Sequence, residues 1–97
     1  MIKVYVSNEK IEIHGHSGYD VVGKDIVCSA VSSIVTTTIN GILSINNDAL
    51  KYSYNNDIMT IEIINRDDIT DKLINNMIDL LKDLSKDYPK NIIVKEM

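Results

Sequence analysis

The chain contains one cysteine, Cys28, and a histidine, His16, stands before it in the same short segment. A thiolate that attacks a carbonyl and an imidazole that takes and returns a proton are the two groups that a thiol hydrolase needs. Three of the chain's four glycines, Gly15, Gly18 and Gly23, lie beside or between them. Because glycine permits positive φ angles, we predict a loop here that acts as a lid and brings His16 to Cys28.

The helix expected after this loop adds chemistry at Cys28. Asp25 has the residue type of a helix N-cap, and an apolar helical pattern begins directly after it. Cys28 should then lie in the first turn, where free N–H groups and the helix dipole lower a thiol pKa. The N–H groups of Val27, Cys28 and Ser29 are the expected donors to an oxyanion.

These residue types also have interpretations without catalysis. A single cysteine is often a small buried hydrophobe, and a redox-sensing thiol would need Cys28 but not His16. Capping alone explains Asp25, and Ser32, one turn after Cys28, has the character of a helix-face residue. Spacing alone leaves the nucleophile and the packing interpretations open.

Two other kinds of site are not supported by the sequence. His14, His16 and Cys28 supply only three zinc ligands and lack the paired spacings of zinc sites. Ser17 lacks the G-x-S-x-G surroundings of a serine nucleophile. We therefore predict no metal and no cofactor.

The elements that must position these residues follow from hydrophobic periodicity. Alternation predicts strands, and steps of three or four predict helices. Asn55–Asp57 is the expected hairpin turn, Asp67 or Asp68 begins the second helix, and Pro89 prevents its continuation. The expected strands are 2–6, 11–13, 50–55, 58–64 and 91–95, and the expected helices are 26–47 and 68–87. This order, ββαββαβ, predicts an α+β fold: a two-layer sandwich of mostly antiparallel sheet with two helices.

Both helices should present apolar faces to the core. The rows expected in the first helix are Val27, Val31, Ile34, Thr38, Ile42 and Ile45, and beside them Val35, Ile39 and Leu43. The stripe expected in the second helix is Ile69, Leu73, Met77, Leu80, Leu81 and Leu84. Residues 26–47 carry no charge and have the length of a membrane span, but ten of them are Ser, Thr or Asn. We therefore predict a buried helix that packs on the sheet and on a second subunit, and no contact with a membrane.

Composition limits the classes of partner. The 97 residues are expected to form one domain, 1–97, with a net charge of −4. Because no cluster of Lys or Arg occurs, direct nucleic-acid binding is not expected, and a basic peptide is the better electrostatic match. One cysteine and a first segment with the alternation of a strand favour a cytoplasmic protein.

The motifs together resemble a known family. Gly15-His16-Ser17, then Gly23-Lys24-Asp25-Ile26-Val27-Cys28, then Ser29-Ala30-Val31-Ser32, resemble the signature of the bacterial ribosomal-processing cysteine proteases, the Prp family. Ser17 and Ser29 stand where alanine is common in that family, and both remain small. The pattern is long and ordered, so the resemblance favours the catalytic interpretation of Cys28.

The resemblance implies a role for each matching residue. His16 would be the base, Cys28 the nucleophile, and Asp25 and Ser32 supporting residues. It further implies a small α/β sandwich that forms a homodimer. The implied substrate is the N-terminal extension of large-subunit ribosomal protein number twenty-seven. The alternative function is a non-enzymatic, dimeric, ribosome-associated interaction module in which Cys28 only packs in the core.

Overall fold

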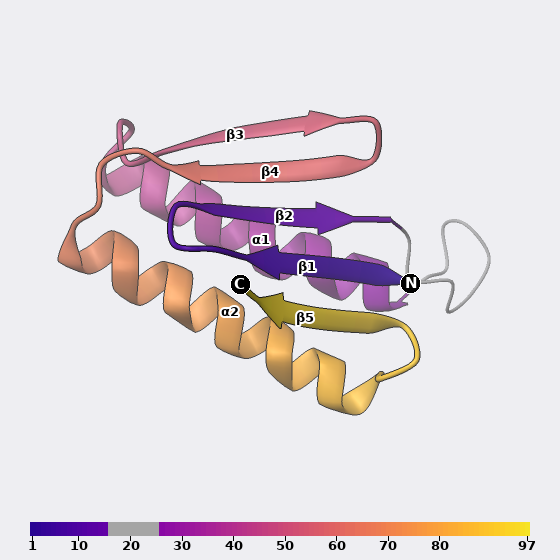
Figure 1. Ribbon diagram of the computed structural model, residues 1–97. Coiled ribbons are helices and arrows are strands. Elements are labelled where there is room, and N and C mark those ends of the chain that lie inside the picture. Colours follow the sequence, from indigo (N-terminus) through magenta and orange to yellow (C-terminus); the bar gives the residue numbers. More distant parts are fainter. Residues whose placement is uncertain (16–25) are drawn as a thin grey trace.

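A computed structural model describes residues 1–15 and 26–97 of the chain and contains two helices and one sheet (Figure 1). The sequence-predicted order ββαββαβ is confirmed. The strands are β1 (Ile2–Val6), β2 (Lys10–His14), β3 (Leu50–Asn55), β4 (Ile58–Ile63) and β5 (Ile92–Glu96). The helices are α1 (Ile26–Ile45) and α2 (Asp68–Asp87).

The sheet has the strand order β3-β4-β2-β1-β5. Every neighbouring pair is antiparallel except β1 and β5, which run parallel with Ile2 opposite Ile92. The mostly antiparallel α+β class is therefore confirmed. β3 and β5 are the two edge strands, and β1 and β2 lie in the interior of the sheet.

Only one face of the sheet is packed. Val4, Ile11 and Ile61 are buried, whereas Lys3 and Glu62, which point to the other face, are exposed. Both helices contribute residues to the same core cluster, so both cover that one face. This arrangement places the first turn of α1 beneath the end of the sheet where β1 begins and β2 finishes (Figure 1).

The β3–β4 hairpin closes through the predicted turn. Asn56 and Asp57 have φ angles of 53° and 63°, and Asn55 pairs directly with Ile58. Two central residues with positive φ match the right-handed twist of the flanking strands, and Asn and Asp tolerate that conformation.

The apolar faces of the helices differ in part from the prediction. In α1 the buried residues are Val27, Val31, Val35, Ile39 and Ile42, so both predicted rows contribute to one face. Ile45, the last residue of the helix, is 61% exposed, because α1 ends two residues before the predicted 47 and its last turn passes beyond the core. Among the described residues, α1 is the one helix long and apolar enough to cross a membrane. Its inner face is instead part of the core.

The stripe of α2 was predicted partly on the wrong residues. The buried residues are Thr70, Ile74, Met77, Ile78 and Leu81, whereas Ile69 is 51% and Leu80 is 42% exposed. Because α2 packs against both α1 and β5, its buried arc is centred farther around the helix than the stripe from Ile69 to Leu84. α2 begins at Asp68, one of the two predicted starts, and Asp67 is its N-cap, since its carboxylate accepts a 2.7 Å hydrogen bond from the Thr70 N–H.

Candidate functional site

Cys28 lies in the first turn of α1, as the sequence predicted. The helix begins at Ile26, so Cys28 is its third residue. Its side chain is half-buried and packs against the core cluster, while Val27 is fully buried and Ser29 is exposed. The N–H groups of a first helical turn have no partner inside the helix, so this position suits an anion.

A small pocket of about 70 Å³ lies beside Cys28. Three parts of the fold meet there: the start of β1 with the end of β2, the first turns of α1, and the tip of the β3–β4 hairpin. The lining residues are Ile2, Ile13, Gly15, Cys28, Val31, Ser32, Tyr54, Asp57 and Met59. The structure thus brings together Gly15, Cys28 and Ser32, three of the sequence-predicted site residues. Their neighbours Tyr54, Asp57 and Met59 carried no signal in the sequence, because the hairpin lies far from Cys28 along the chain.

Gly15 occupies a position at this pocket that only glycine fits. Its φ angle is +81°, and a Cβ built on it would stand 2.9 Å from the carbonyl oxygen of Met1. Its N–H donates to the carbonyl of Asp57 across 3.4 Å. The residue that directly precedes His16 is therefore held by two separate segments. His16, Gly18, Gly23 and Asp25, the other predicted site residues, lie outside the described residues.

His14 belongs to the other face of the sheet. Side chains alternate along a strand, and Ile13 lines the Cys28 pocket, so His14 points away from it. Its ring meets Tyr5 edge-on with centroids 5.1 Å apart, and its Nε2 lies 3.2 Å from Glu12. Hydrogen bonds from His14 and Lys10 lower the pKa of Glu12. His14 and Cys28, two of the three possible zinc ligands, therefore lie on opposite faces of the sheet. Within residues 1–15 and 26–97, no three His, Cys, Asp or Glu side chains are grouped so that they could hold a metal ion.

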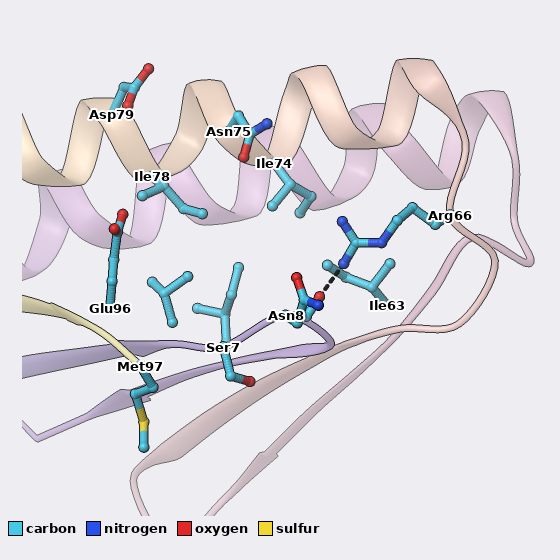
Figure 2. A pocket seen from close by; sticks show the side chains of 12 residues that line it. Ser7, Asn8, Ile63, Arg66, Ile74, Asn75, Ile78, Asp79, Glu96 and Met97 are labelled. Atoms are coloured by element: carbon cyan, nitrogen blue, oxygen red, sulfur yellow. Dashed lines mark hydrogen bonds between the residues drawn. The ribbon is translucent and has the colours of Figure 1, made fainter.

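A larger cavity of about 440 Å³ lies at the other end of the sheet, between α2 and the last residues of β1, β4 and β5 (Figure 2). Its apolar lining comes from Val6, Ile11, Ile63, Ile74 and Ile78. Two charged groups of its lining have partners: Arg66 binds Asp71 and the carbonyl of Asn8, and Glu96 pairs with Lys82. Neither cysteine nor histidine lines it, so this cavity is separate from the thiol chemistry.

Known structures share this fold. The ribosomal processing protease Prp from S. aureus, with a covalently linked product peptide, superposes with a TM-score of 0.93 at 20% identity over 100% of both chains. The same protease with a substrate peptide gives a TM-score of 0.87 at 19% identity, again over 100% of both chains. SMU.848 from Streptococcus mutans gives 0.78 at 19% identity, over 99% of this chain and 91% of that one.

Sequence comparison adds the family. No curated protein matches the chain. The family described as Cysteine protease Prp matches residues 1–93, nearly the whole chain, and this span includes the first turn of α1 with Cys28. The chain therefore belongs to the Prp family of cysteine proteases.

Proposed function

We propose that this protein is a cytoplasmic endopeptidase that removes the N-terminal extension of bacterial large-subunit ribosomal protein number twenty-seven. The observation that carries the proposal is the position of Cys28 in the first turn of α1, open to a pocket that Ser32 also lines. The solved S. aureus Prp structures with substrate and product peptides support a peptide substrate.

The proposed reaction is acyl transfer through Cys28. His16 takes the proton of the Cys28 thiol, and the thiolate adds to the peptide carbonyl carbon to form a C–S bond. The N–H groups of Val27, Cys28 and Ser29 donate to the resulting oxyanion. The C–N bond then breaks, the leaving amine takes the proton from His16, and an acyl thioester remains on Cys28. Water, deprotonated by His16, adds to the thioester, and the C–S bond breaks to release the carboxylate product and the thiolate.

Asp25 and Ser32 have supporting roles in this proposal. Ser32 stands one helical turn after Cys28 and shares its pocket, so its hydroxyl is placed to orient a group there. The segment from Gly15 to Gly23 is proposed to complete the site only when the correct peptide binds, which protects other cytoplasmic proteins from cleavage. Hydrogen exchange tests this gating: equal protection of residues 15–23 with and without substrate peptide would contradict it.

The peptide-cleavage assay tests the function itself. A synthetic peptide that spans the ribosomal-protein extension should be cut by the wild type and not by Cys28→Ala or His16→Ala, with unchanged circular dichroism. Cleavage by Cys28→Ala at the wild-type rate would remove Cys28 as the nucleophile. Membership of a cysteine protease family favours this function over the interaction module in which Cys28 only packs.

We further propose a homodimer that uses the outer face of α1. That face is uncharged over the length of the helix and, beyond the turn that lines the Cys28 pocket, carries the exposed residues Ser33, Thr36, Thr37, Asn40 and Ser44. Hydroxyl and amide groups cost less to desolvate against a second copy than charged groups would, and they can form hydrogen bonds across the interface. Thr36→Lys should convert a dimer to a monomer in light scattering, whereas the matched change Asn76→Lys on the exposed side of α2 should not. A monomeric wild type would contradict this proposal.

A further inference from the structure

The pocket beside Cys28 has one wall from a distant part of the chain. Tyr54, at the end of β3, and Met59, at the start of β4, are paired across the hairpin, and both line the pocket. Asp57 adds the turn between them. The hydrogen bond from the Gly15 N–H to the Asp57 carbonyl joins this hairpin tip to the end of β2. The hairpin is therefore anchored to the site at its tip.

Tyr54 stands at the mouth of the pocket. It is 60% exposed, and its hydroxyl donates to Asp57 across 3.5 Å. β3 is an edge strand, so no further strand of the sheet lies beyond Tyr54. Tyr52, two residues earlier, points to the same face of β3 and is also exposed at 47%, but it does not line the pocket. An exposed ring at the mouth of a pocket that contains Cys28 can contact whatever Cys28 attacks.

Geometry restricts what can enter this pocket. When Cys28 attacks a carbonyl carbon, the adjacent Cα is one bond away, and successive Cα atoms are about 3.8 Å apart. A side chain next to the cleaved bond is therefore the one placed nearest to a pocket that Cys28 itself lines. The pocket is apolar on most sides, from Ile2, Ile13, Val31 and Met59. An apolar side chain gains free energy by entering such a space, and a polar one loses its hydration.

We propose that the tip of the β3–β4 hairpin selects the substrate, with Tyr54 as a specificity-determining residue that covers an apolar side chain next to the cleaved bond. The proposal rests on the proposed peptidase function. At about 70 Å³ the pocket is small, so a long side chain needs the ring of Tyr54 to move outward. Its position on an edge strand leaves room for that movement. At the mouth of the pocket the Tyr54 hydroxyl lies 3.5 Å from the Asp57 carboxylate.

The test compares two tyrosines of the same strand. Two extension peptides are made that differ only in the residue before the cleaved bond, Leu in one and the similarly sized Asn in the other. Tyr54→Thr should lower the ratio of kcat/KM for the Leu peptide to kcat/KM for the Asn peptide about tenfold, the usual scale for losing part of an apolar pocket. Tyr52→Thr, which changes another exposed ring of the same strand outside the pocket, should leave the ratio within about twofold of wild type. Threonine keeps a strand former at both positions, and thermal melts check the fold.

The outcomes separate this inference from the function beneath it. The role of Tyr54 would be overturned if the wild type cuts the peptides and both variants keep its Leu-to-Asn ratio, or if the ratio falls equally in both variants. Either result would leave the peptidase function intact. A wild type that cuts neither these peptides nor the native extension removes both proposals. Tyr54→Phe keeps the ring and loses the hydrogen bond to Asp57. It should retain the wild-type ratio, since the ring supplies the apolar cover, and a fall as large as that of Tyr54→Thr would contradict this.

Discussion

Gly15 and Met1 approach each other so closely that no side chain fits between them: a Cβ on Gly15 would stand 2.9 Å from the Met1 carbonyl oxygen. The atom that such a Cβ would meet belongs to the backbone of Met1, so it cannot move aside as the end of a flexible side chain could. Together with the φ angle of +81° at Gly15, it fixes the course of the chain at the residue before His16. The first residue of the chain therefore restricts which residue type can stand at position 15, the end of the first described segment.

Gly15→Ala should impair both stability and catalysis. A positive φ and a backbone clash should together lower the free energy of unfolding by about 1–3 kcal/mol. Cleavage of the extension peptide should fall at least about tenfold, because a displaced base costs that much or more. Urea denaturation and kcat/KM measure the two effects.

Gly41 provides the control for that substitution. It lies within α1, and nothing stands within 4 Å of a Cβ placed on it. Gly41→Ala should therefore raise the free energy of unfolding by roughly 0.5–1 kcal/mol through helix propensity, and it should leave cleavage unchanged. Equal losses of activity in the two alanine variants would contradict the special role of Gly15.

The reactivity of Cys28 should depend on pH in a way that reveals its surroundings. The first turn of a helix stabilises a thiolate, so alkylation by iodoacetamide should rise with an inflection below that of a free thiol, about 8.5. The urea-unfolded protein provides that reference. In His16→Ala the part of the lowering that persists belongs to the helix terminus, and the part that is lost belongs to the imidazole. An identical inflection in the native and unfolded protein would contradict an activated thiol.

Two apolar residues of α2 should differ greatly in their effect on stability. Ile78 is 7% exposed and belongs to the core, whereas Leu80 is 42% exposed. Ile78→Ala should lower the free energy of unfolding by about 2–4 kcal/mol through lost burial and a cavity. Leu80→Ala should cost less than about 1 kcal/mol. Chemical denaturation measures both, and a reversed order would show that α2 is rotated relative to this fold.

Asp67 should make stability depend on pH at the acidic end. The hydrogen bond from the backbone N–H of Thr70, with further bonds from the Thr70 hydroxyl and Asn46, lowers the pKa of Asp67 below its ordinary value of 3.8. Its stabilisation is thus complete above 3.8 and disappears as the pH falls through the lower native value. Asp67→Asn keeps a capping oxygen but loses the negative charge at the helix N-terminus, so Tm at pH 7 should fall by about 2–5 °C. The difference from wild type should shrink below pH 4.

Asp83→Asn is the matched control for Asp67. It removes the same charge from an exposed position on the same helix. The difference in Tm between Asp83→Asn and wild type should not shrink between pH 4 and pH 2, as the difference for Asp67→Asn should. A melting series from pH 7 to 2 compares the three proteins, and parallel curves for both variants would contradict the capping role of Asp67.

Local rules predicted much of this fold. The alternation in β1 and β2, the Asn56-Asp57 turn and the start of α2 at Asp68 each depend on neighbours in the sequence, and each is confirmed. The parallel pairing of β1 with β5 and the exposure of Ile69 depend on how distant elements pack, which periodicity does not contain.

The same distinction applies to the site. The position of Cys28 in the first turn of α1 follows from a local helix-start signal and is confirmed. Tyr54 and Met59 reach the pocket only because β4 pairs with β2, so no pattern near Cys28 could have indicated them. The catalytic roles of His16 and Cys28 remain predictions that the cleavage assay decides.

The parallel pairing of the first and last strands has a consequence for the protein's own synthesis. Ile2 forms part of the wall beside Cys28, and its N–H donates to the carbonyl of Asn91 across 2.8 Å. While the chain is still being translated, a nascent polypeptide that has emerged as far as α2 already contains Cys28 but lacks β5 beside β1. The backbone bonds that hold Ile2 in this wall are therefore completed only after β5 has left the exit tunnel.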